Sequence, residues 1–433
     1  SAAAVLLMAH HDSVWGSPGA PDDGAGVVTA LEVARQVAAK GPPPRDLIVL
    51  LTDAEELGLQ GAAQFFAGDP LLPRIGAVIN MEARGGGGRT TLFETTPENG
   101  EAIALYRQAA SLPGASSLAV FVYSVLPNDT DLSEAMKGDW AGYNFAFIGR
   151  PGLYHSPLAT PDALDRGALM DMGWQVSELT QALLAAPELP GRAPDVVFFD
   201  LYGLSLVKYP ASLGWLMLAI AAIALGVAAK RDRSLRALGQ GAGRSAGLML
   251  LAAAVFYVLN RISGAGAGAN YYDRLAAIPL LEVMALLAAT ACFLLVLGRG
   301  LSGTAARVGA VLPLALIGLA MQALAPTAAY VVVVPVMLAA LVLAAGELLP
   351  PDPARAIAVL LGALVLGYML ALGHQLMQGV GPDLPSVAAL PLGLAVLALI
   401  PLWPGLSKGR RVGMVLLLAA LAVALWVRFD SVA

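Results

Sequence analysis

The sequence predicts two parts of different class: an α/β domain with a mostly parallel sheet between layers of helices, and an all-α domain of transmembrane helices after it. Short apolar runs alternate with helical patterns up to about residue 190. Long apolar stretches fill most of the chain from residue 213 onward. The composition agrees, because charged residues make up only 13 % of the chain, whereas soluble domains carry about 25 %.

Strand-like and helix-like segments alternate through the first part. Alternation of this kind favours a layered α/β domain. We expect strands at residues 5–9, 47–52, 75–81, 91–94, 120–124 and 144–148, and helices at residues 26–40, 58–66, 99–112 and 163–186. The apolar run at the start is too short for a signal peptide or a span and lacks a basic flank. We therefore interpret this domain as truncated at its N-terminus.

The second part contains eight apolar stretches of the length that crosses a bilayer, which is about 20 residues. They lie at residues 213–229, 245–260, 275–297, 306–325, 328–346, 355–373, 384–403 and 411–427. Prolines inside several of them, among them Pro313, Pro335 and Pro391, are tolerated in membrane helices. The expected domains are therefore residues 1–190 for the α/β domain, 191–212 for a linker, 213–427 for the transmembrane domain and 428–433 for a tail.

Basic residues between the spans predict the orientation of the chain, because cytoplasmic loops are enriched in Lys and Arg. The loops after the first, third, fifth and seventh spans carry eleven of them: Lys230, Arg231, Arg233, Arg236, Arg244, Arg299, Arg307, Arg355, Lys408, Arg410 and Arg411. The other loops and the tail carry three, which are Arg261, Arg274 and Arg428. We therefore expect the α/β domain on the non-cytoplasmic side.

Histidine and acidic residues follow several of the expected strands, where sites form in open α/β sheets. His10, Asp22, Glu56, Glu82 and His155 make a set of nitrogen and oxygen donors that suits zinc. Two zinc ions about 3.5–4 Å apart need a bridging carboxylate and flanking ligands, and this set is large enough for both. The chain has a single cysteine, Cys292, and it lies in an apolar run, so a zinc site built from cysteine thiolates is excluded. Strand alternation lets only one of His10 and His11 ligate.

A further carboxylate, Glu55, adjoins this set and could take a proton from a bridging water. Each motif alone has an ordinary explanation, since paired glutamates often begin a solvated helix and Asp-Asp-Gly often forms a turn. Their occurrence together, each after an expected strand, favours a metal site. The net charge of −5 offers no basic surface for nucleic acid.

The motifs resemble those of the di-zinc exopeptidase family that includes secreted bacterial aminopeptidases. They look most like its membrane branch of endoplasmic reticulum metallopeptidases and vacuolar membrane proteases. The resemblance is carried by the segments at residues 10–13, 19–24, 55–56, 80–82 and 154–155, and it continues into residues 197–203 and 208–210. One position departs from the family pattern, because Ala159 stands where an aspartate is expected after the final histidine.

The resemblance implies a role for each residue. His10 and Glu82 would bind one zinc ion, Glu56 and His155 the other, and Asp22 would bridge the two. Asp12 would orient His10, Glu55 would be the general base, and Tyr154 would donate to the oxyanion of the tetrahedral intermediate. The Asp22–Asp23 peptide bond is expected to be cis.

The predicted function is that of an integral-membrane zinc metallopeptidase of the aminopeptidase type, with peptides as substrates and the lipid bilayer as its surroundings. The Ala- and Gly-rich composition and the single cysteine favour a bacterial inner membrane, with the catalytic domain in the periplasm. Two alternatives stay open. One is an enzyme like glutaminyl cyclase that uses a single zinc ion, and the other is a receptor or transporter whose peptidase-like domain only binds peptides. The oligomeric state is not predicted.

Glu282 is an acidic residue well inside a predicted span. A carboxylate in hydrocarbon costs at least about 2.5 kcal/mol on insertion scales. We therefore expect Glu282 either to sit at the interface or to line a polar pocket in the bundle. Within such a pocket, Arg261 is the expected partner in preference to Arg274, and His374 and Gln375 are expected to join it.

Overall fold

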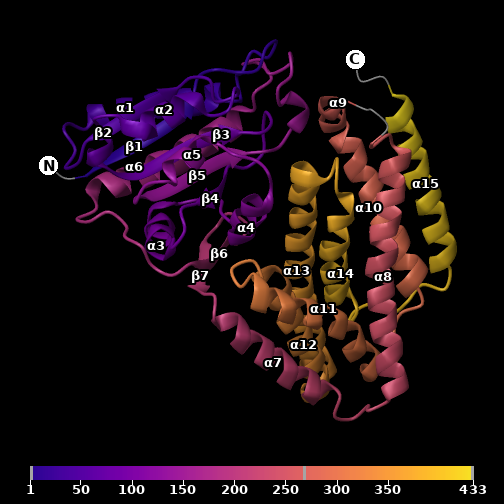
Figure 1. The fold of residues 1–433 in the computed structure, drawn as a ribbon. Helices are drawn as coiled ribbons and strands as arrows, with labels where there is room; N and C mark the ends of the chain where they lie inside the picture. The colour runs from indigo at the N-terminus through magenta and orange to yellow at the C-terminus, as the bar shows by residue number, and fades with distance from the viewer. Residues whose placement is uncertain (1–2, 267–269, 431–433) are drawn as a thin grey trace. The chain divides into compact units, whose positions relative to one another are not determined.

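The computed structural model describes residues 3–266 and 270–430, and the chain divides into two compact units (Figure 1). The first unit comprises Ser1–Ala211 and the second Ser212–Ala433. The first contains all seven strands of the described residues. The second is helical. The predicted combination of an α/β domain followed by an all-α domain is confirmed.

The sheet of the first unit has five strands in the order β2-β1-β3-β5-β4. Strands β2, β1, β3 and β5 run parallel, and only β4 is antiparallel to its neighbour. The bounds are β1 Ala4–His10, β2 Leu47–Thr52, β3 Ile75–Ala83, β4 Thr91–Thr95 and β5 Ala141–Phe147. Parallel pairing brings the carboxyl ends of β1, β2, β3 and β5 to one edge.

Helices cover both faces of this sheet, which explains the continuous apolar sequence of β1. Val5 and Leu7 join one buried cluster with residues of α1 and α6, whereas Leu6 and Met8 join another beside α2 and α5. The helices are α1 Gly24–Ala39, α2 Gln60–Gly68, α3 Gly100–Ala109, α4 Ser117–Val125, α5 Asp131–Ala135 and α6 Arg166–Ala185.

The strand expected at residues 120–124 is wrong, because this segment belongs to α4. The run of β-branched and aromatic residues has high strand propensity. Two features stabilise the helix instead. The Ser116 side chain caps it by accepting from the Ala119 N–H, and the Tyr123 ring packs edge-on against Phe93 of β4, with centroids 4.8 Å apart.

The segment interpreted as a linker contains a β-hairpin of β6, Val196–Asp200, and β7, Leu206–Pro210. Phe198 of this hairpin is buried in the core of the first unit. Its backbone N–H donates to the hydroxyl of Ser117 at 3.1 Å. The hairpin is therefore packed as part of the α/β unit.

The second unit has a helix at each of the eight positions expected to span a membrane. The helices are α7 Leu213–Ala228, α8 Leu235–Ile262, α9 Tyr271–Ala276, α10 Ile278–Leu297, α11 Thr304–Leu324, α12 Tyr330–Leu348, α13 Pro351–Val380, α14 Ala389–Leu399 and α15 Gly409–Phe429. Within the described residues, six of them are long and apolar enough to cross a membrane. Two apolar helices are shorter: α7, and Pro385–Leu399, which consists of a 3-10 turn and α14. That these two cross the membrane stays a prediction.

Glu282 of α10 contacts polar side chains of α13. Its Oε1 lies 2.8 Å from Nδ1 of His374 and accepts from Nε2 of Gln378 at 3.2 Å. The prediction that Arg261 pairs with Glu282 is wrong, since no ion pair joins these two residues in the described parts of the chain. Arg274 donates instead to Asn260 and Ser263. Such contacts give polar side chains the hydrogen bonds that lipid tails cannot provide.

Candidate metal centre

The candidate ligands come from the carboxyl ends of the parallel strands. His10 is the last residue of β1, and Glu82 is the second-last residue of β3. Glu56 lies in the loop that follows β2, and His155 lies in the loop that follows β5. Asp22 precedes α1. Four neighbouring strands therefore deliver side chains to one edge of the sheet, where open α/β sheets form their sites.

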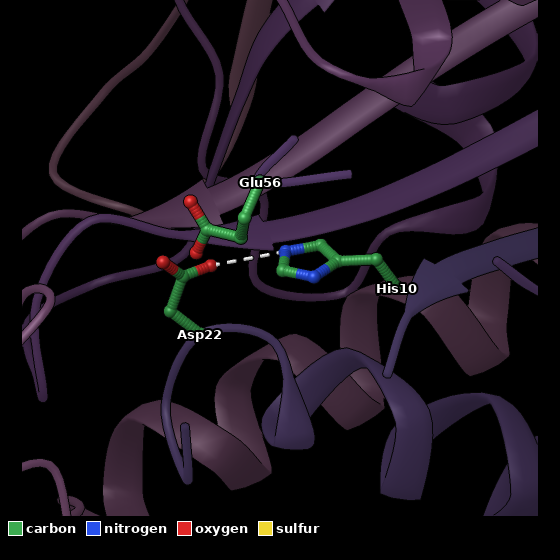
Figure 2. A group of neighbouring side chains, drawn as sticks. All are labelled: His10, Asp22 and Glu56. Atoms are coloured by element: carbon green, nitrogen blue, oxygen red, sulfur yellow. Dashed lines mark hydrogen bonds and ion pairs between the residues drawn. The ribbon is translucent and has the colours of Figure 1, made fainter. Parts of the chain in front are cut away.

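His10, Asp22 and Glu56 form a compact group (Figure 2), and one ligand atom of each lies within 4.8 Å of the other two. Nε2 of His10 is 3.2 Å from Oδ1 of Asp22, the contact drawn as a dashed line. His10 is 1 % exposed, whereas His11 is exposed. The structure thus brings His10, and not its neighbour, into the group.

The two oxygens of the Asp22 carboxylate face different histidines. Oδ1 is 3.2 Å from Nε2 of His10, and Oδ2 is 3.2 Å from Nε2 of His155. Each histidine has a further carboxylate beside it, since Glu82 Oε2 is 3.6 Å from His10 and Glu56 Oε1 is 2.8 Å from His155. All five candidate ligands therefore converge, with Asp22 between two His–Glu pairs.

Asp12 connects two parts of the site. Its carboxylate accepts from the backbone N–H of Glu55 at 3.1 Å and from that of Glu56 at 3.2 Å. Its backbone carbonyl is 3.0 Å from Nδ1 of His10, and its Oδ1 is 3.5 Å from the same nitrogen. Asp12 thus fixes both the His10 ring and the loop that carries Glu55. The second of these contacts is not apparent from the sequence.

Asp23 holds the start of α1. Its Oδ1 accepts from the backbone N–H of Gly26 at 3.0 Å, which is the contact of an N-cap residue. A Cβ at Gly26 would lie 2.3 Å from Oδ2 of Asp23, so a larger residue there would displace the capping carboxylate. The Asp22–Asp23 peptide bond is cis, as expected.

Tyr154 stacks on the ligand that follows it in sequence. The rings of Tyr154 and His155 have centroids 3.7 Å apart at 20°. Ala159, which replaces the expected aspartate, is buried, and its carbonyl accepts from the N–H of Ala20 at 3.0 Å. This backbone contact ties the His155 loop to the loop of Asp22 without the missing carboxylate. The oxyanion role of Tyr154 stays a prediction.

Two buried amide side chains, those of Asn80 and Asn144, lie behind the site and were not among the predicted site residues. Nδ2 of Asn80 donates to Oε1 of Glu82 at 3.2 Å and to Oδ1 of Asn144 at 3.1 Å. Asn144 donates in turn to Glu94 at 2.8 Å. Because residues two apart on a strand share a face, the Asn80-Met-Glu82 string contained the signal for the first contact.

Asp131 was also missed. It is 1 % exposed, and its carboxylate accepts from the hydroxyl of Thr52, the last residue of β2. Asp131 begins α5, the next helix after the segment wrongly expected to form a strand.

Burial and neighbouring charge shift the proton affinities of the site. Burial raises the pKa of Glu55 to about 8, and the nearby Glu82 carboxylate adds to this effect. Burial alone would lower the pKa of His155, but hydrogen bonds to Asp22 and Glu56 outweigh it and raise the pKa to about 10. A carboxylate with a pKa near neutrality can exchange protons efficiently at physiological pH.

The donor set fits zinc. Carboxylate oxygens and imidazole nitrogens are zinc ligands, and thiolates are not required. The carboxylates of Asp22, Asp23 and Glu82 are all buried, and the imidazoles of His10 and His155 contact Asp22, Glu82 and Glu56. Buried carboxylates at this density need compensating positive charge, which divalent cations would supply.

Zinc binding to the metal-free protein is expected to release protons at pH 7. A pKa of about 10 keeps His155 protonated there, and a ligand must lose its proton to bind metal. The hydrogen bonds of protonated His155 to Asp22 and Glu56 stabilise the metal-free fold. This stabilisation is fully present below about pH 6.5, the ordinary pKa of histidine, and is lost as pH rises through about 10. Zinc affinity should therefore weaken as pH falls. Calorimetric titration in two buffers of different ionisation enthalpy measures the release, and equal heats in both would contradict it.

Comparison with known proteins finds a matching family and several relatives. Residues 1–180 match the family model described as "Peptidase family M28". Rat endoplasmic reticulum metallopeptidase 1 is 36 % identical over 219 residues, which is 49 % of this chain and 24 % of the relative. The vacuolar membrane protease of Yarrowia lipolytica is 32 % identical over 213 residues, covering 48 % and 21 %. The chain thus spans about a quarter of the length of these relatives.

Two solved structures resemble the chain at low similarity. An aminopeptidase from Aneurinibacillus sp. strain AM-1 matches with 22 % identity and a TM-score of 0.33, covering 45 % of this chain and 46 % of that one. A zinc aminopeptidase from Bacillus subtilis matches with 21 % identity and the same TM-score, covering 41 % and 45 %.

Proposed function

Because residues 1–180 belong to peptidase family M28, we propose that this chain is a membrane-embedded zinc metallopeptidase that hydrolyses peptides with two zinc ions. One observation carries the proposal. The Asp22 carboxylate has one oxygen 3.2 Å from His10 and the other 3.2 Å from His155, and a glutamate stands beside each histidine. This is the arrangement a bridging ligand between two metal ions needs.

The five ligand side chains divide into two sets that share Asp22. His10 and Glu82 would hold one zinc ion, and Glu56 and His155 the other. The chemistry that zinc supplies in such sites is Lewis acidity, which polarises a carbonyl oxygen and makes a water molecule more acidic. Asp12 would keep the His10 ring in its orientation, as carboxylates and carbonyls behind zinc-bound histidines generally do.

Glu55 is proposed to carry the proton through the reaction. Its carboxylate would take a proton from the attacking water as oxygen adds to the peptide carbonyl carbon. It would then give that proton to the leaving nitrogen as the C–N bond breaks, so that an acid and an amine result. The Tyr154 hydroxyl would donate a hydrogen bond to the oxyanion. Asp12 positions Glu55, because its carboxylate accepts a hydrogen bond from the backbone N–H of Glu55 at 3.1 Å.

An aminopeptidase specificity follows from the resemblance of the motifs and is part of the proposal. Its test is a screen of the purified full chain, in detergent with zinc, against aminoacyl substrates, dipeptides and peptides with blocked amino termini. Hydrolysis of free but not blocked peptides is expected. Hydrolysis of internal bonds in blocked peptides would overturn the exopeptidase assignment. If no peptide is hydrolysed, the assignment of the chain as a peptidase is overturned.

The α/β unit is proposed to face away from the cytoplasm, in the periplasm of a bacterium. The support is the excess of basic residues, eleven against three, in the loops on the opposite side. The two relatives named above come from a mammal and a fungus, so the bacterial inner membrane rests on composition.

Cysteine labelling tests this orientation. Ser234 and Glu188 are both exposed, and the native Cys292 is buried. A membrane-impermeant thiol reagent is expected to label Glu188→Cys in intact bacterial cells expressing the protein, and to label Ser234→Cys only after the membrane is opened. The reverse pattern would contradict the orientation.

A further inference from the structure

A row of polar side chains crosses the sheet behind Glu82. The pairing of β3 with β5 sets Asn80 opposite Asn144, and the pairing of β4 with β5 sets Glu94 opposite the same residue. All three side chains of the row are buried. Three neighbouring strands therefore place two amides and a carboxylate next to one another in the interior, and the row ends two residues before a proposed metal ligand.

Hydrogen bonds join this row from end to end. Nδ2 of Asn144 donates to Oε2 of Glu94 at 2.8 Å and to the hydroxyl of Thr130 at 2.8 Å. Both protons of this amide nitrogen are thereby used. The amide oxygen of Asn144 accepts from Nδ2 of Asn80 at 3.1 Å. The same Nδ2 of Asn80 donates to Oε1 of Glu82 at 3.2 Å.

The direction of these bonds depends on the glutamate at the far end of the row. An ionised carboxylate only accepts hydrogen bonds, whereas an amide can present either its oxygen or its NH2 group. Because Glu94 accepts, Asn144 presents its NH2 group to Glu94 and its oxygen to Asn80. Asn80 then presents its NH2 group to Glu82. Within the described residues the oxygen of Asn80 has no hydrogen-bond partner, so the orientation of this amide depends on the two bonds that it donates.

The two oxygens of Glu82 consequently have different surroundings. Oε1 accepts from Asn80, and Oε2 lies 3.6 Å from Nε2 of His10. If the Asn80 amide were reversed, its oxygen would face Oε1, and two buried acceptors would stand together without a donor, which is costly. The Glu82 carboxylate would then turn away, and Oε2 would leave its place beside His10.

We propose that Glu94 is a positioning residue for the metal centre, which holds Glu82 through Asn144 and Asn80 so that Oε2 is left for the zinc ion beside His10. Groups that orient a metal ligand from behind typically contribute roughly 10- to 100-fold to metal affinity. This inference rests on the proposed function and adds to it a residue on β4, a strand that supplies none of the five proposed ligands.

The test compares two substitutions of Glu94 that differ in whether an acceptor remains. Glu94→Gln removes the charge and keeps an oxygen that can accept from Asn144, whereas Glu94→Met removes the acceptor at similar side-chain volume. The matched control is Glu178→Met on α6, where the carboxylate accepts from the N–H and the hydroxyl of Ser111 at 2.8 and 2.6 Å. Zinc affinity is measured on the metal-free full chain by competition with a chelator. The pH is kept above the value of about 7 to which burial raises the pKa of Glu94, so that this carboxylate is ionised in wild type.

Glu94→Met is expected to weaken the binding of one of the two zinc ions roughly 10- to 100-fold. The other ion should bind as in wild type, because its proposed ligands Glu56 and His155 are not part of the row. Glu94→Gln should lose less affinity than Glu94→Met, and Glu178→Met should lose none. Equal losses in the two Glu94 variants would show that only the charge matters and would overturn the role of the amides. Unchanged affinity in Glu94→Met would overturn the inference and leave the proposed peptidase intact.

A double-mutant cycle tests whether the effect of Glu94 passes through the amides. Asn80→Leu removes the donor to Glu82 at similar volume and should itself weaken the same zinc ion. In that background a substitution of Glu94 should change zinc affinity little further, because the row is already interrupted, so the two losses should not add. Additive losses would refute the proposed route. If Glu94→Met does not fold, the cycle with Glu94→Gln makes the same decision.

The same titration separates this inference from the proposed function. Wild-type protein that binds two zinc ions, together with unchanged affinity in both Glu94 variants, would contradict only the inference. Wild-type protein that binds no zinc would overturn the proposed function and the inference with it.

Discussion

Glu55→Gln is expected to lower kcat by roughly 10²- to 10⁴-fold, the usual contribution of general acid–base catalysis. Glutamine keeps the volume of the side chain and cannot accept the proton. The metal content should stay unchanged, because Glu55 is not one of the five converging ligand side chains. Substrate affinity should change little, so the loss should appear in kcat.

The matched control is Glu32→Gln on the exposed face of α1, where Glu32 contacts only Arg35 and Gln36 among the described residues. It removes the same charge outside the site and should leave kcat unchanged. Undiminished turnover in Glu55→Gln would refute the role of this carboxylate. Loss of zinc in that variant would show instead that Glu55 binds metal.

Asp22→Asn is expected to have the largest effect on metal content. The amide carries no negative charge and has one oxygen, so it cannot join two cations as the carboxylate does. A metal ion contributes several kcal/mol to such reactions, which corresponds to roughly a 10³-fold loss of rate. Zinc content measured by elemental analysis should fall clearly below that of wild type.

Asp23→Asn is the control for Asp22→Asn. Asparagine is as good an N-cap as aspartate, so the contact to Gly26 that begins α1 can be kept. This variant removes a carboxylate next to Asp22 in sequence and should retain its zinc. If both variants lost metal equally, the site would depend on total negative charge and not on the bridging position of Asp22.

Much of the fold could be predicted because the signals were long or repeated. The parallel sheet was visible in apolar runs such as Leu47–Thr52, which are covered on both faces and need no polar alternation. The helices of the second unit were visible in their length and apolarity. The segment at residues 120–124 failed because strand propensity is weaker than a cap and tertiary packing, and both act on α4.

The candidate site could be predicted as a set of residues but not as a geometry. Residue type and position after strands pointed to His10, Asp22, Glu56, Glu82 and His155, and the motif resemblance added their roles. The double contact of Asp12 with the Glu55 loop depends on how two separate loops fold against each other. The link between Asn80 and Asn144 depends on the pairing of β3 with β5. Neither pairing leaves a mark in local sequence.

Zinc-edge anomalous scattering from crystals of the full chain tests the central claim most directly. Two peaks are expected, one beside Oδ1 of Asp22 and His10 and the other beside Oδ2 of Asp22 and His155, separated by about 3.5–4 Å. A single peak at full occupancy would contradict the two-zinc mechanism and favour chemistry of the glutaminyl-cyclase type. The absence of any peak from protein crystallised with zinc would contradict a metal centre at Asp22 altogether.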